Sequence, residues 1–212
     1  MAVVEATRPQ EDSPENAVEA RAATALLTCI ARYGLTKTTL DDVAREARCS
    51  RATLYRYFDS KQDLVRRTAA GEIDRLTARV VEAGRAQSTF SDAVVAVVVT
   101  AAHELTHHAA LRFLLAHEPE AILTHLTFGP GDRLLTSIAD ALAPAFTQWL
   151  PLAEAARAGD WLAPFLRSYV LMPVPTIDLT DERAARPFLH EFVIPGLSPE
   201  SQFEESQFEE SR

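Results

Sequence analysis

The chain has 212 residues, of which 47% are hydrophobic and 24% are charged, and it carries a formal net charge of −9 at pH 7. This composition is that of a globular protein, and the longest apolar run, residues 93–102, is too short to cross a bilayer. The N-terminus is acidic and polar where a signal peptide would be basic and then apolar, so we expect a cytoplasmic protein that has no membrane partner.

Helical signals begin near the N-terminus. Only seven glycines and long stretches rich in Ala, Leu, Arg and Glu favour an all-α fold. After a tail at residues 1–12 that we expect to be disordered, Ser13-Pro14-Glu15 is a helix start signal. Apolar residues follow at helical spacing until Gly34, which is typical of a helix C-terminus. A first helix is therefore predicted over residues 14–33.

Capping patterns divide the next segment. Thr38-Thr39-Leu40-Asp41 has the pattern of a helix start, and Ser50 can cap a second short helix over residues 51–58. Ser60-Lys61-Gln62-Asp63 repeats the pattern and opens a long helix. Two short helices joined by a tight turn at Arg48-Cys49 indicate a helix-turn-helix. The helical spacing of its apolar residues predicts which side chains form the core. These are Leu40, Val43, Ala47, Leu54 and Phe58.

Positive charge is concentrated in the same segment. From Arg32 to Arg67 there are nine Lys and Arg residues and five Asp and Glu residues, a local charge of +4, so the rest of the chain carries −13. A cationic region on an acidic body suits a protein that presents one small face to a polyanion. We therefore predict that residues 13–60 form a DNA-binding domain.

The stretch KTTLDDVAREARCSRATLYRYFDSKQDLV resembles the DNA-binding segment of the tetracycline-repressor (TetR) family of transcriptional regulators. The family usually has Gly-Val where this chain has Arg48 and Cys49. That glycine relieves a left-handed turn conformation, so Arg48 either strains the turn or changes its geometry. The residues that match in register are Thr38, Thr39, Val43, Ala44, Ala47, Ser50, Thr53, Leu54, Tyr55, Tyr57, Phe58, Lys61 and Leu64.

Several side chains of this segment are candidates for contact with DNA. Helix-turn-helix proteins place the first turn of the second helix in the major groove, where Arg51 is the candidate to read a guanine, with a phosphate contact as the alternative. The resemblance implies that Tyr55, Lys61 and the Thr38/Thr39 cap contact phosphates. The candidate DNA-binding residues are Thr38, Thr39, Ser50, Arg51, Ala52, Thr53, Tyr55, Arg56, Tyr57 and Lys61.

The remainder is predicted to be a second helical domain over residues 61–197. Pro144 and Pro164 lie within helical patterns and are expected to kink them. The repeated acidic sequence at residues 198–212 is expected to be a low-complexity tail. The predicted helices of this domain cover residues 61–86, 90–108, 110–126, 131–149, 153–172 and 181–194.

The last two predicted helices are rich in aromatic residues. They resemble the dimerising helix pair of TetR-type proteins, although these side chains could also close the core of one subunit. The aromatic residues concerned are Trp161, Phe165, Tyr169, Phe188 and Phe192.

Residues 103–107, HELTH, match the H-E-x-x-H pattern of zinc hydrolases. A third ligand is missing, because Ala110 and Phe113 occupy the positions of the expected glycine and histidine. We favour a segment that borders an apolar effector site; a metal site with His117, or a solvated helix face, is the alternative. The candidate ligand-binding residues are Val99, His103, His107, Phe113, Leu114, Phe128, Phe165 and Tyr169.

Together these features predict an all-α, homodimeric regulator with an N-terminal helix-turn-helix domain and a C-terminal domain for ligand binding and dimerisation. We expect a repressor that is released from a palindromic operator in double-stranded DNA by a small hydrophobic effector. We expect no enzymatic activity, no metal and no cofactor. The alternatives are an effector-independent DNA-binding protein and a zinc hydrolase that uses the HELTH segment.

Overall fold

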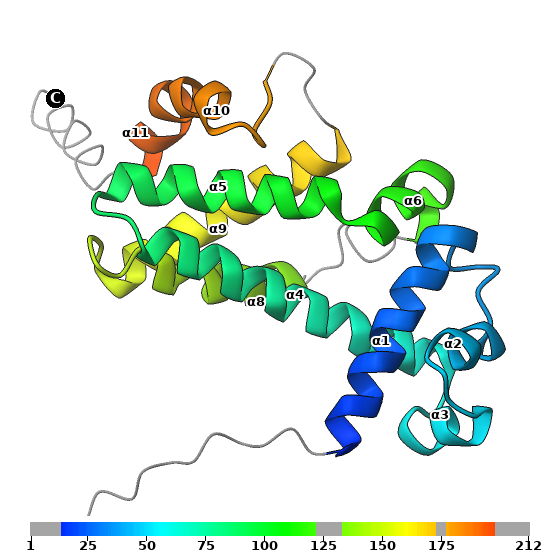
Figure 1. Cartoon of the computed structure of the whole chain (residues 1–212). Helices are drawn as coiled ribbons and strands as arrows, with labels where there is room; N and C mark the ends of the chain where they lie inside the picture. Colours follow the sequence, from blue (N-terminus) through cyan, green and yellow to red (C-terminus); the bar gives the residue numbers. More distant parts are fainter. Residues whose placement is uncertain (1–13, 122–132, 173–176, 198–212) are drawn as a thin grey trace, which may run out of the picture. The chain divides into compact units, whose positions relative to one another are not determined.

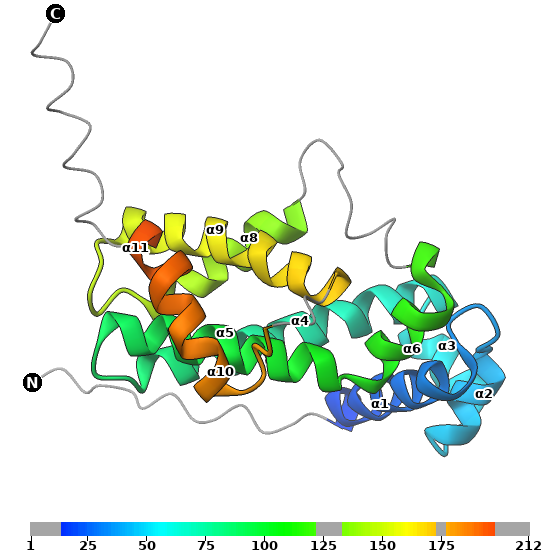
Figure 2. The same cartoon turned by 90° about the horizontal axis from the view of Figure 1, so that it is seen from above.

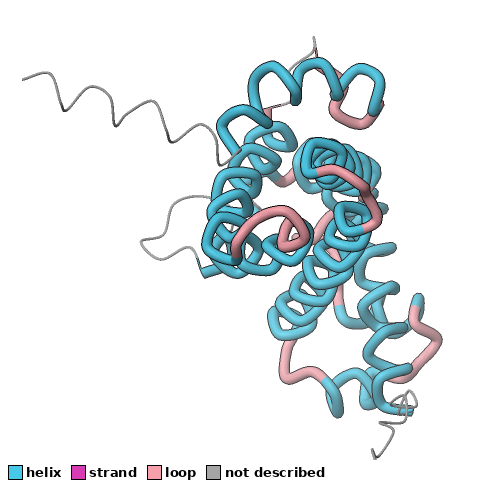
Figure 3. The backbone as a smooth tube through the Cα atoms, turned by 90° about the vertical axis from the view of Figure 1, so that its left-hand side faces the viewer, coloured by secondary structure: helices cyan, strands magenta, loops and turns pink. Residues whose placement is uncertain are grey.

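The computed structural model describes residues 14–121, 133–172 and 177–197, and within these ranges it contains helices and no strands (Figures 1 and 3). The predicted all-α class is confirmed. The chain divides into two units, residues 1–69 and 70–212. The division falls inside the long helix α4, Lys61–Arg85, because its first turns bury Leu64 and Thr68 in the first unit. Both predicted tails lie outside the described residues.

The first unit consists of α1, Pro14–Tyr33, α2, Leu40–Glu46, α3, Arg51–Tyr57, and the start of α4. Gly34 ends α1 with a φ of 85°, as its sequence position predicted. Of the predicted core residues, Val43, Ala47, Leu54 and Phe58 are buried, whereas Leu40 is half-buried. The helix α3 ends one residue earlier than predicted, because Phe58 is in an extended conformation.

The cap of α2 lies one residue later than the sequence pattern indicated. Thr39, in place of Thr38, is the N-cap, and it forms a capping box with Asp42, in place of Asp41. Thr38 is buried, and its hydroxyl donates to the Gly34 carbonyl at 2.6 Å. This correction leaves the Asp41 carboxylate outside the cap.

The turn between α2 and α3 keeps the hydrogen bonds of a Schellman motif. The Cys49 N–H donates to the Ala44 carbonyl at 2.9 Å, and the Arg48 N–H donates to the Arg45 carbonyl at 3.2 Å. Arg48 has a φ of 53° and is the one non-glycine residue with positive φ among the described residues. The sequence left two outcomes open, a strained Arg48 or a changed turn. The structure shows the first, because the turn keeps its usual hydrogen bonds and Arg48 takes the left-handed conformation.

The second unit is built around α5, whose apolar residues between Ala93 and Ala102 are almost all buried. Helix α9 packs against both α8 and α5, and α10 packs against α5 (Figure 2). Gly159 permits the close approach of α9 to α8, because a Cβ there would collide with the Ala139 carbonyl. The helices after α4 are α5, Phe90–His107; α6, Ala109–His117; α8, Arg133–Leu142; η1, Ala143–Ala145; α9, Leu152–Leu171; α10, Glu182–Phe188; η2, Leu189–Val193; and α11, Ile194–Leu197.

Of the two prolines expected to kink a helix, Pro164 lies inside one and Pro144 does not. Pro144 does not bend a long helix; α8 ends at Leu142, and the proline lies in the 3-10 turn η1. A proline lacks the N–H that would continue the α-helical ladder. Pro164 lies inside α9, as predicted, and that helix extends to Leu171. The predicted helix over 181–194 is interrupted by a π-helical turn, η2.

In the described ranges no single helix is long and apolar enough to cross a membrane. The pair formed by α5 and α6 reaches that length and hydropathy only in combination, with a bend of 66° between the two helices. Most of the apolar residues of α5 lie in the core of the second unit.

Candidate nucleic-acid interface

The first turn of α3 is capped and exposed. The Ser50 hydroxyl accepts a hydrogen bond from the Thr53 N–H at 3.0 Å, which confirms the predicted cap, and the two hydroxyls lie 2.8 Å apart. Ser50, Arg51 and Ala52 are exposed, and Thr53 is half-buried. Short side chains at an exposed helix start are those that a helix-turn-helix inserts between the walls of the major groove.

Arg51 is held by an acidic partner from the neighbouring helix. Its Nε lies 2.6 Å from Oδ1 of Asp41, and both side chains remain about half exposed. A hydrogen bond to the Tyr55 side chain, and then the charge of Asp41, raise the pKa of Arg51. Sequence reasoning missed Asp41, because the capping pattern assigned that residue to the start of α2.

The two tyrosines of α3 differ in exposure. Tyr55 has 52% of its surface exposed, whereas Tyr57 is half-buried. The Arg56 guanidinium lies 5.0 Å from the centre of the Tyr57 ring and donates to its hydroxyl at 3.1 Å. Arg56 itself is exposed, so α3 presents both a phenol and a guanidinium to solvent.

Other predicted contact residues have structural partners. Thr38 is 1% exposed and its hydroxyl donates to the Gly34 carbonyl, so this side chain is directed into the first unit and away from solvent. Lys61 is half-buried and donates from Nζ to the Leu35 carbonyl at 2.6 Å, which leaves other N–H donors of the ammonium for a second partner.

Part of the cationic segment stabilises the first unit itself. The Arg67 guanidinium lies 4.8 Å from the centre of the Phe58 ring, donates to the Tyr57 carbonyl at 2.8 Å and forms an ion pair with Glu19. Three further arginines form ion pairs with acidic residues: Arg32 with Glu46, Arg45 with Asp42 and Arg66 with Asp63. The exposed cations of the segment include Lys37, Arg48 and Arg56.

Comparison with known proteins agrees with this geometry. Residues 23–68 match the family model for bacterial regulatory proteins, tetR family. An uncharacterised HTH-type transcriptional regulator from Mycobacterium tuberculosis strain H37Rv is 30% identical over 171 residues, which cover 76% of each chain. The corresponding protein of strain CDC 1551 gives the same values. The chain belongs to the TetR family of transcriptional regulators.

Solved structures of two regulators share the helical fold over most of the chain. The TetR family repressor AlkX from Dietzia sp. strain DQ12-45-1b superposes with a TM-score of 0.65 at 21% identity, and the match covers 89% of this chain and 97% of AlkX. The fatty acid degradation regulator FadR from Bacillus halodurans superposes with a TM-score of 0.57 at 18% identity, covering 86% of this chain and 95% of FadR. As a TetR-family member, the protein is a DNA-binding regulator and not an enzyme.

The HELTH segment of this TetR-family chain has its own internal contacts. The rings of His103 and His107 stack at 4.2 Å, and Nδ1 of His107 lies 2.8 Å from the His103 carbonyl. Glu104 forms an ion pair with Arg79 at 3.0 Å. Within the described ranges no group of three His, Cys, Asp or Glu side chains is arranged to hold a metal ion.

The candidate ligand residues do not share one environment. Val99, Phe165 and Tyr169 pack against the core of the second unit and are partly buried, and the Tyr169 hydroxyl accepts from the Leu179 N–H at 3.1 Å. His103 and His107 are exposed, which is compatible both with the border of a site and with a solvated helix face. Phe113 and Leu114, on α6, are partly buried. Phe128 lies outside the described residues.

Aromatic side chains of α9, α10 and η2 form a continuous ladder. Successive ring centres lie 5.8 Å apart for Trp161 and Phe165, 6.4 Å for Phe165 and Phe188, and 5.3 Å for Phe188 and Phe192. The two ends are open to solvent, since 49% of Trp161 and 61% of Phe192 are exposed. We call these four residues the aromatic ladder.

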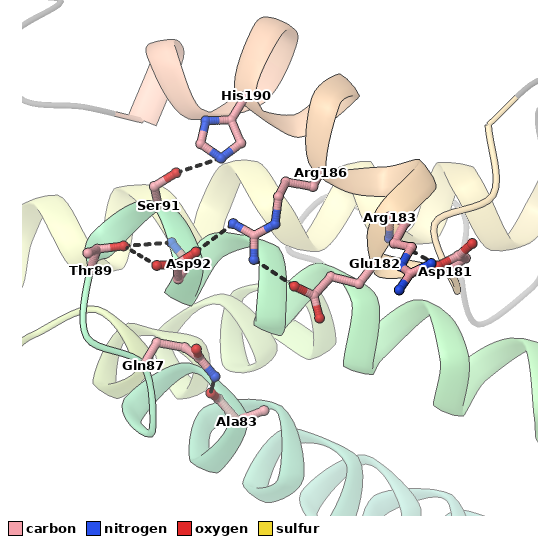
Figure 4. A network of polar contacts seen from close by, with 10 residues as sticks. All are labelled: Ala83, Gln87, Thr89, Ser91, Asp92, Asp181, Glu182, Arg183, Arg186 and His190. Carbon is pink, nitrogen blue, oxygen red and sulfur yellow. Dashed lines mark hydrogen bonds and ion pairs between the residues drawn. The ribbon is translucent and has the colours of Figure 1, made fainter.

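Polar contacts fasten α10 and η2 to the start of α5 (Figure 4). Arg186 bonds to Asp92 at 2.5 Å and to Glu182 at 2.6 Å, and His190 lies 3.1 Å from the Ser91 hydroxyl. The hydrogen bond from Arg186, and then that from Thr89, lower the pKa of Asp92. These contacts hold in place the segment that carries half of the aromatic ladder.

Proposed function

We propose that the protein is a transcriptional repressor that binds a palindromic operator as a homodimer and leaves it when a small hydrophobic effector binds. The observation that carries this proposal is the exposed, Ser50-capped first turn of α3 in a chain of the TetR family. Two such turns, one from each subunit, would enter major grooves about one helical turn apart. Because the partner is chromosomal DNA, this function requires a cytoplasmic location.

The proposed DNA contacts fall into two classes. Ser50, Arg51, Ala52 and Thr53 meet base edges, where short side chains and a guanidinium distinguish base pairs. Thr39, Tyr55, Arg56, Tyr57 and Lys61 lie beside the phosphates, which fix the orientation of the protein without reading sequence. Of the two tyrosines, Tyr55 is the more exposed and so is the more accessible to a phosphate.

Dimerisation is assigned to the aromatic ladder. The two ends of the ladder, Trp161 and Phe192, expose apolar area, and burial against a second copy would remove that area from water. The stable homodimer that we propose needs an interface above roughly 1,000 Å². The ladder continues from α9 to η2 and so can form the centre of such an interface.

We assign the effector-binding site to the second unit. Its proposed site uses the partly buried Val99, Phe113, Leu114, Phe165 and Tyr169, with the exposed His103 and His107 at its edge. Support for an apolar ligand comes from the two solved neighbours, one implicated in biodegradation of n-alkanes and one a regulator of fatty acid degradation. To empty the operator almost completely, the effector must prefer the released conformation by roughly 5 kcal/mol.

The DNA part is tested by selecting bound sequences from a randomised pool of double-stranded DNA. Tyr55→Ala should then weaken binding to every sequence, and Arg51→Ala should relax the preference at one base pair by about 1–3 kcal/mol. Arg112→Ala, which removes an exposed cation from α6, is the control and should change neither property. A pool that shows no enrichment with the parent protein would refute operator recognition.

The effector part is tested by adding long-chain alkanes and fatty acids to the protein on its selected operator and following release by fluorescence anisotropy. Phe113→Ala/Leu114→Ala should weaken the release without changing operator affinity. His103→Ala/His107→Ala tests whether the exposed histidines contact the ligand or only solvent. If no member of the panel alters DNA binding, the protein is better described as an effector-independent DNA-binding protein.

A further inference from the structure

An acidic residue lies in the surface that we assign to DNA. Asp41 belongs to the first turn of α2, and its carboxylate reaches across to Arg51 at the first position of α3, with 2.6 Å between Oδ1 and Nε. The Asp41 side chain is 48% exposed and that of Arg51 is 61% exposed. The pair is therefore accessible at the point where α3 would meet base edges.

Folding gives this carboxylate only a small role. The N-terminus of α2 is already capped by Thr39 and Asp42, so Asp41 adds only the weak attraction of a carboxylate to the first turn of a helix. An exposed ion pair adds little to stability, because the gain is offset by solvation and by loss of side-chain freedom. A carboxylate close to DNA also repels phosphates and lowers sequence-independent affinity. A benefit in another property has to offset this repulsion.

The contact between Asp41 and Arg51 bears on the orientation of the Arg51 guanidinium. Asp41 engages the Nε edge of the guanidinium, and each of the two terminal nitrogens carries two further N–H donors. Two parallel N–H donors match O6 and N7 of guanine, but only when the guanidinium plane is correctly oriented. Tyr55 lies one turn further along α3, on the same face, and takes part in holding the Arg51 side chain. Arg51 is thus restrained from two sides before DNA arrives.

We propose that Asp41 is a positioning residue for sequence recognition: it orients Arg51 to read one guanine and gives up some total DNA affinity in exchange for that preference. This inference rests on the proposed function, because it requires Arg51 to contact a base. It adds a residue on α2 to the determinants of specificity, outside the recognition helix itself. A restrained arginine loses less side-chain freedom on binding, so its contact is more selective.

The inference is tested with the full chain and a pool of double-stranded DNA that contains a randomised central segment. The parent, Asp41→Asn, Arg51→Ala and the double variant are each used to select sequences, and affinity for a fixed random-sequence duplex is measured in parallel. With the parent protein we expect a guanine preference of about 5- to 150-fold at the position that depends on Arg51. Asp41→Asn should reduce that preference by about tenfold or abolish it, while affinity for the random duplex stays the same or rises.

The double variant and a charge control separate positioning from simple electrostatics. In the Arg51→Ala background, Asp41→Asn should have no further effect on base preference. Glu46→Gln removes one negative charge from the same helix, at an exposed residue paired with Arg32, and should leave the preference at the parent value. Asp41→Glu keeps the charge and should restore part of the preference. Thermal unfolding of each variant checks that the first unit is folded.

Each failure has a distinct signature. If the parent enriches no sequence, or if Arg51→Ala keeps every base preference, the proposed role of Arg51 is wrong. If Arg51→Ala removes a guanine preference and Asp41→Asn leaves it intact, only the positioning role of Asp41 is overturned. A uniform rise in affinity with unchanged preference would assign Asp41 to electrostatic repulsion alone.

Discussion

Thr39 and Asp42 cap α2 by exchanging hydrogen bonds: the Thr39 hydroxyl accepts from the Asp42 N–H at 3.2 Å, and the Asp42 carboxylate accepts from the Thr39 N–H at 3.0 Å. Thr39→Ala removes the side-chain acceptor of the Asp42 N–H, whereas the Asp42 carboxylate can still accept from the backbone N–H of residue 39. Thr39→Ala should therefore lower the free energy of unfolding by about 1 kcal/mol. Denaturant titration followed by circular dichroism measures the change.

The control for the cap is Thr28→Ala. Thr28 lies inside α1, and its hydroxyl donates to the Thr24 carbonyl, which already has a helical partner. We expect a much smaller loss there, because alanine is a better helix former than threonine. Equal losses in the two variants would argue that the threonine side chains act by packing and not by capping.

Substitution of Arg48 should change the stability of the turn between α2 and α3. Its φ of 53° is a left-handed conformation that disfavours any residue with a Cβ. Arg48→Gly should raise the free energy of unfolding by about 1 kcal/mol, and Arg48→Ala, which keeps the Cβ, should not. Chemical denaturation of the three proteins makes the comparison. A gain in the alanine variant as well would attribute the effect to charge and not to backbone strain.

The contact between α8 and α9 depends on Gly159. A methyl group there would meet the Ala139 carbonyl, so Gly159→Ala should force the helices apart and lower the free energy of unfolding by about 2–3 kcal/mol. Gly71→Ala is the matched control, because its Cβ would have no neighbour within 4 Å. In the middle of α4 that change should stabilise by about 0.5–1 kcal/mol. If thermal denaturation showed Gly71→Ala to be less stable than Gly159→Ala, the close packing of α9 against α8 would be contradicted.

Acid should weaken the attachment of α10 to α5 through Asp92. Its pKa is held below the ordinary 3.8 by the hydrogen bond from Arg186 and then that from Thr89. Because the folded-state pKa is the lower one, this contribution to stability is complete above the unfolded-state pKa and is lost as pH falls through the folded value. The free energy of unfolding should fall between about pH 5 and pH 2, and less steeply in Asp92→Asn.

Urea titrations across that pH range provide the measurement for Asp92. Asp140→Asn is the control, since Asp140 is an exposed carboxylate of α8, and it should retain the pH dependence of the parent protein. The same slope in Asp92→Asn and in the parent protein would show that other carboxylates dominate acid unfolding.

The aromatic ladder gives a prediction on assembly. Trp161→Ser/Phe192→Ser removes the two exposed ends, so we expect the proposed dimer to dissociate and operator affinity to fall with it. Met172→Ser is the control, because Met172 is 75% exposed but is not part of the ladder. Sedimentation velocity at micromolar protein distinguishes the two cases. A dimer that persists in the double variant would place the interface elsewhere.

Local signals in the sequence were sufficient for the helix-turn-helix. Pro14, Gly34 and Ser50 act within one helical turn of themselves, through backbone conformation or a cap, so their effects can be read from neighbouring residues. The spacing of apolar residues likewise identified most of the buried residues of α1 to α3. The register with TetR sequences then identified the family, which the relatives confirm.

Contacts between residues distant in the sequence were decided by tertiary packing. Burial of Thr38 against Gly34 moved the cap to Thr39 and left the Asp41 carboxylate free to pair with Arg51 on another helix. Exposure of His103 and His107, which the spacing of HELTH did not determine, depends on which face of α5 the other helices cover. Periodicity shows that a helix has two faces, but only the packed neighbours decide which side chains lose contact with water.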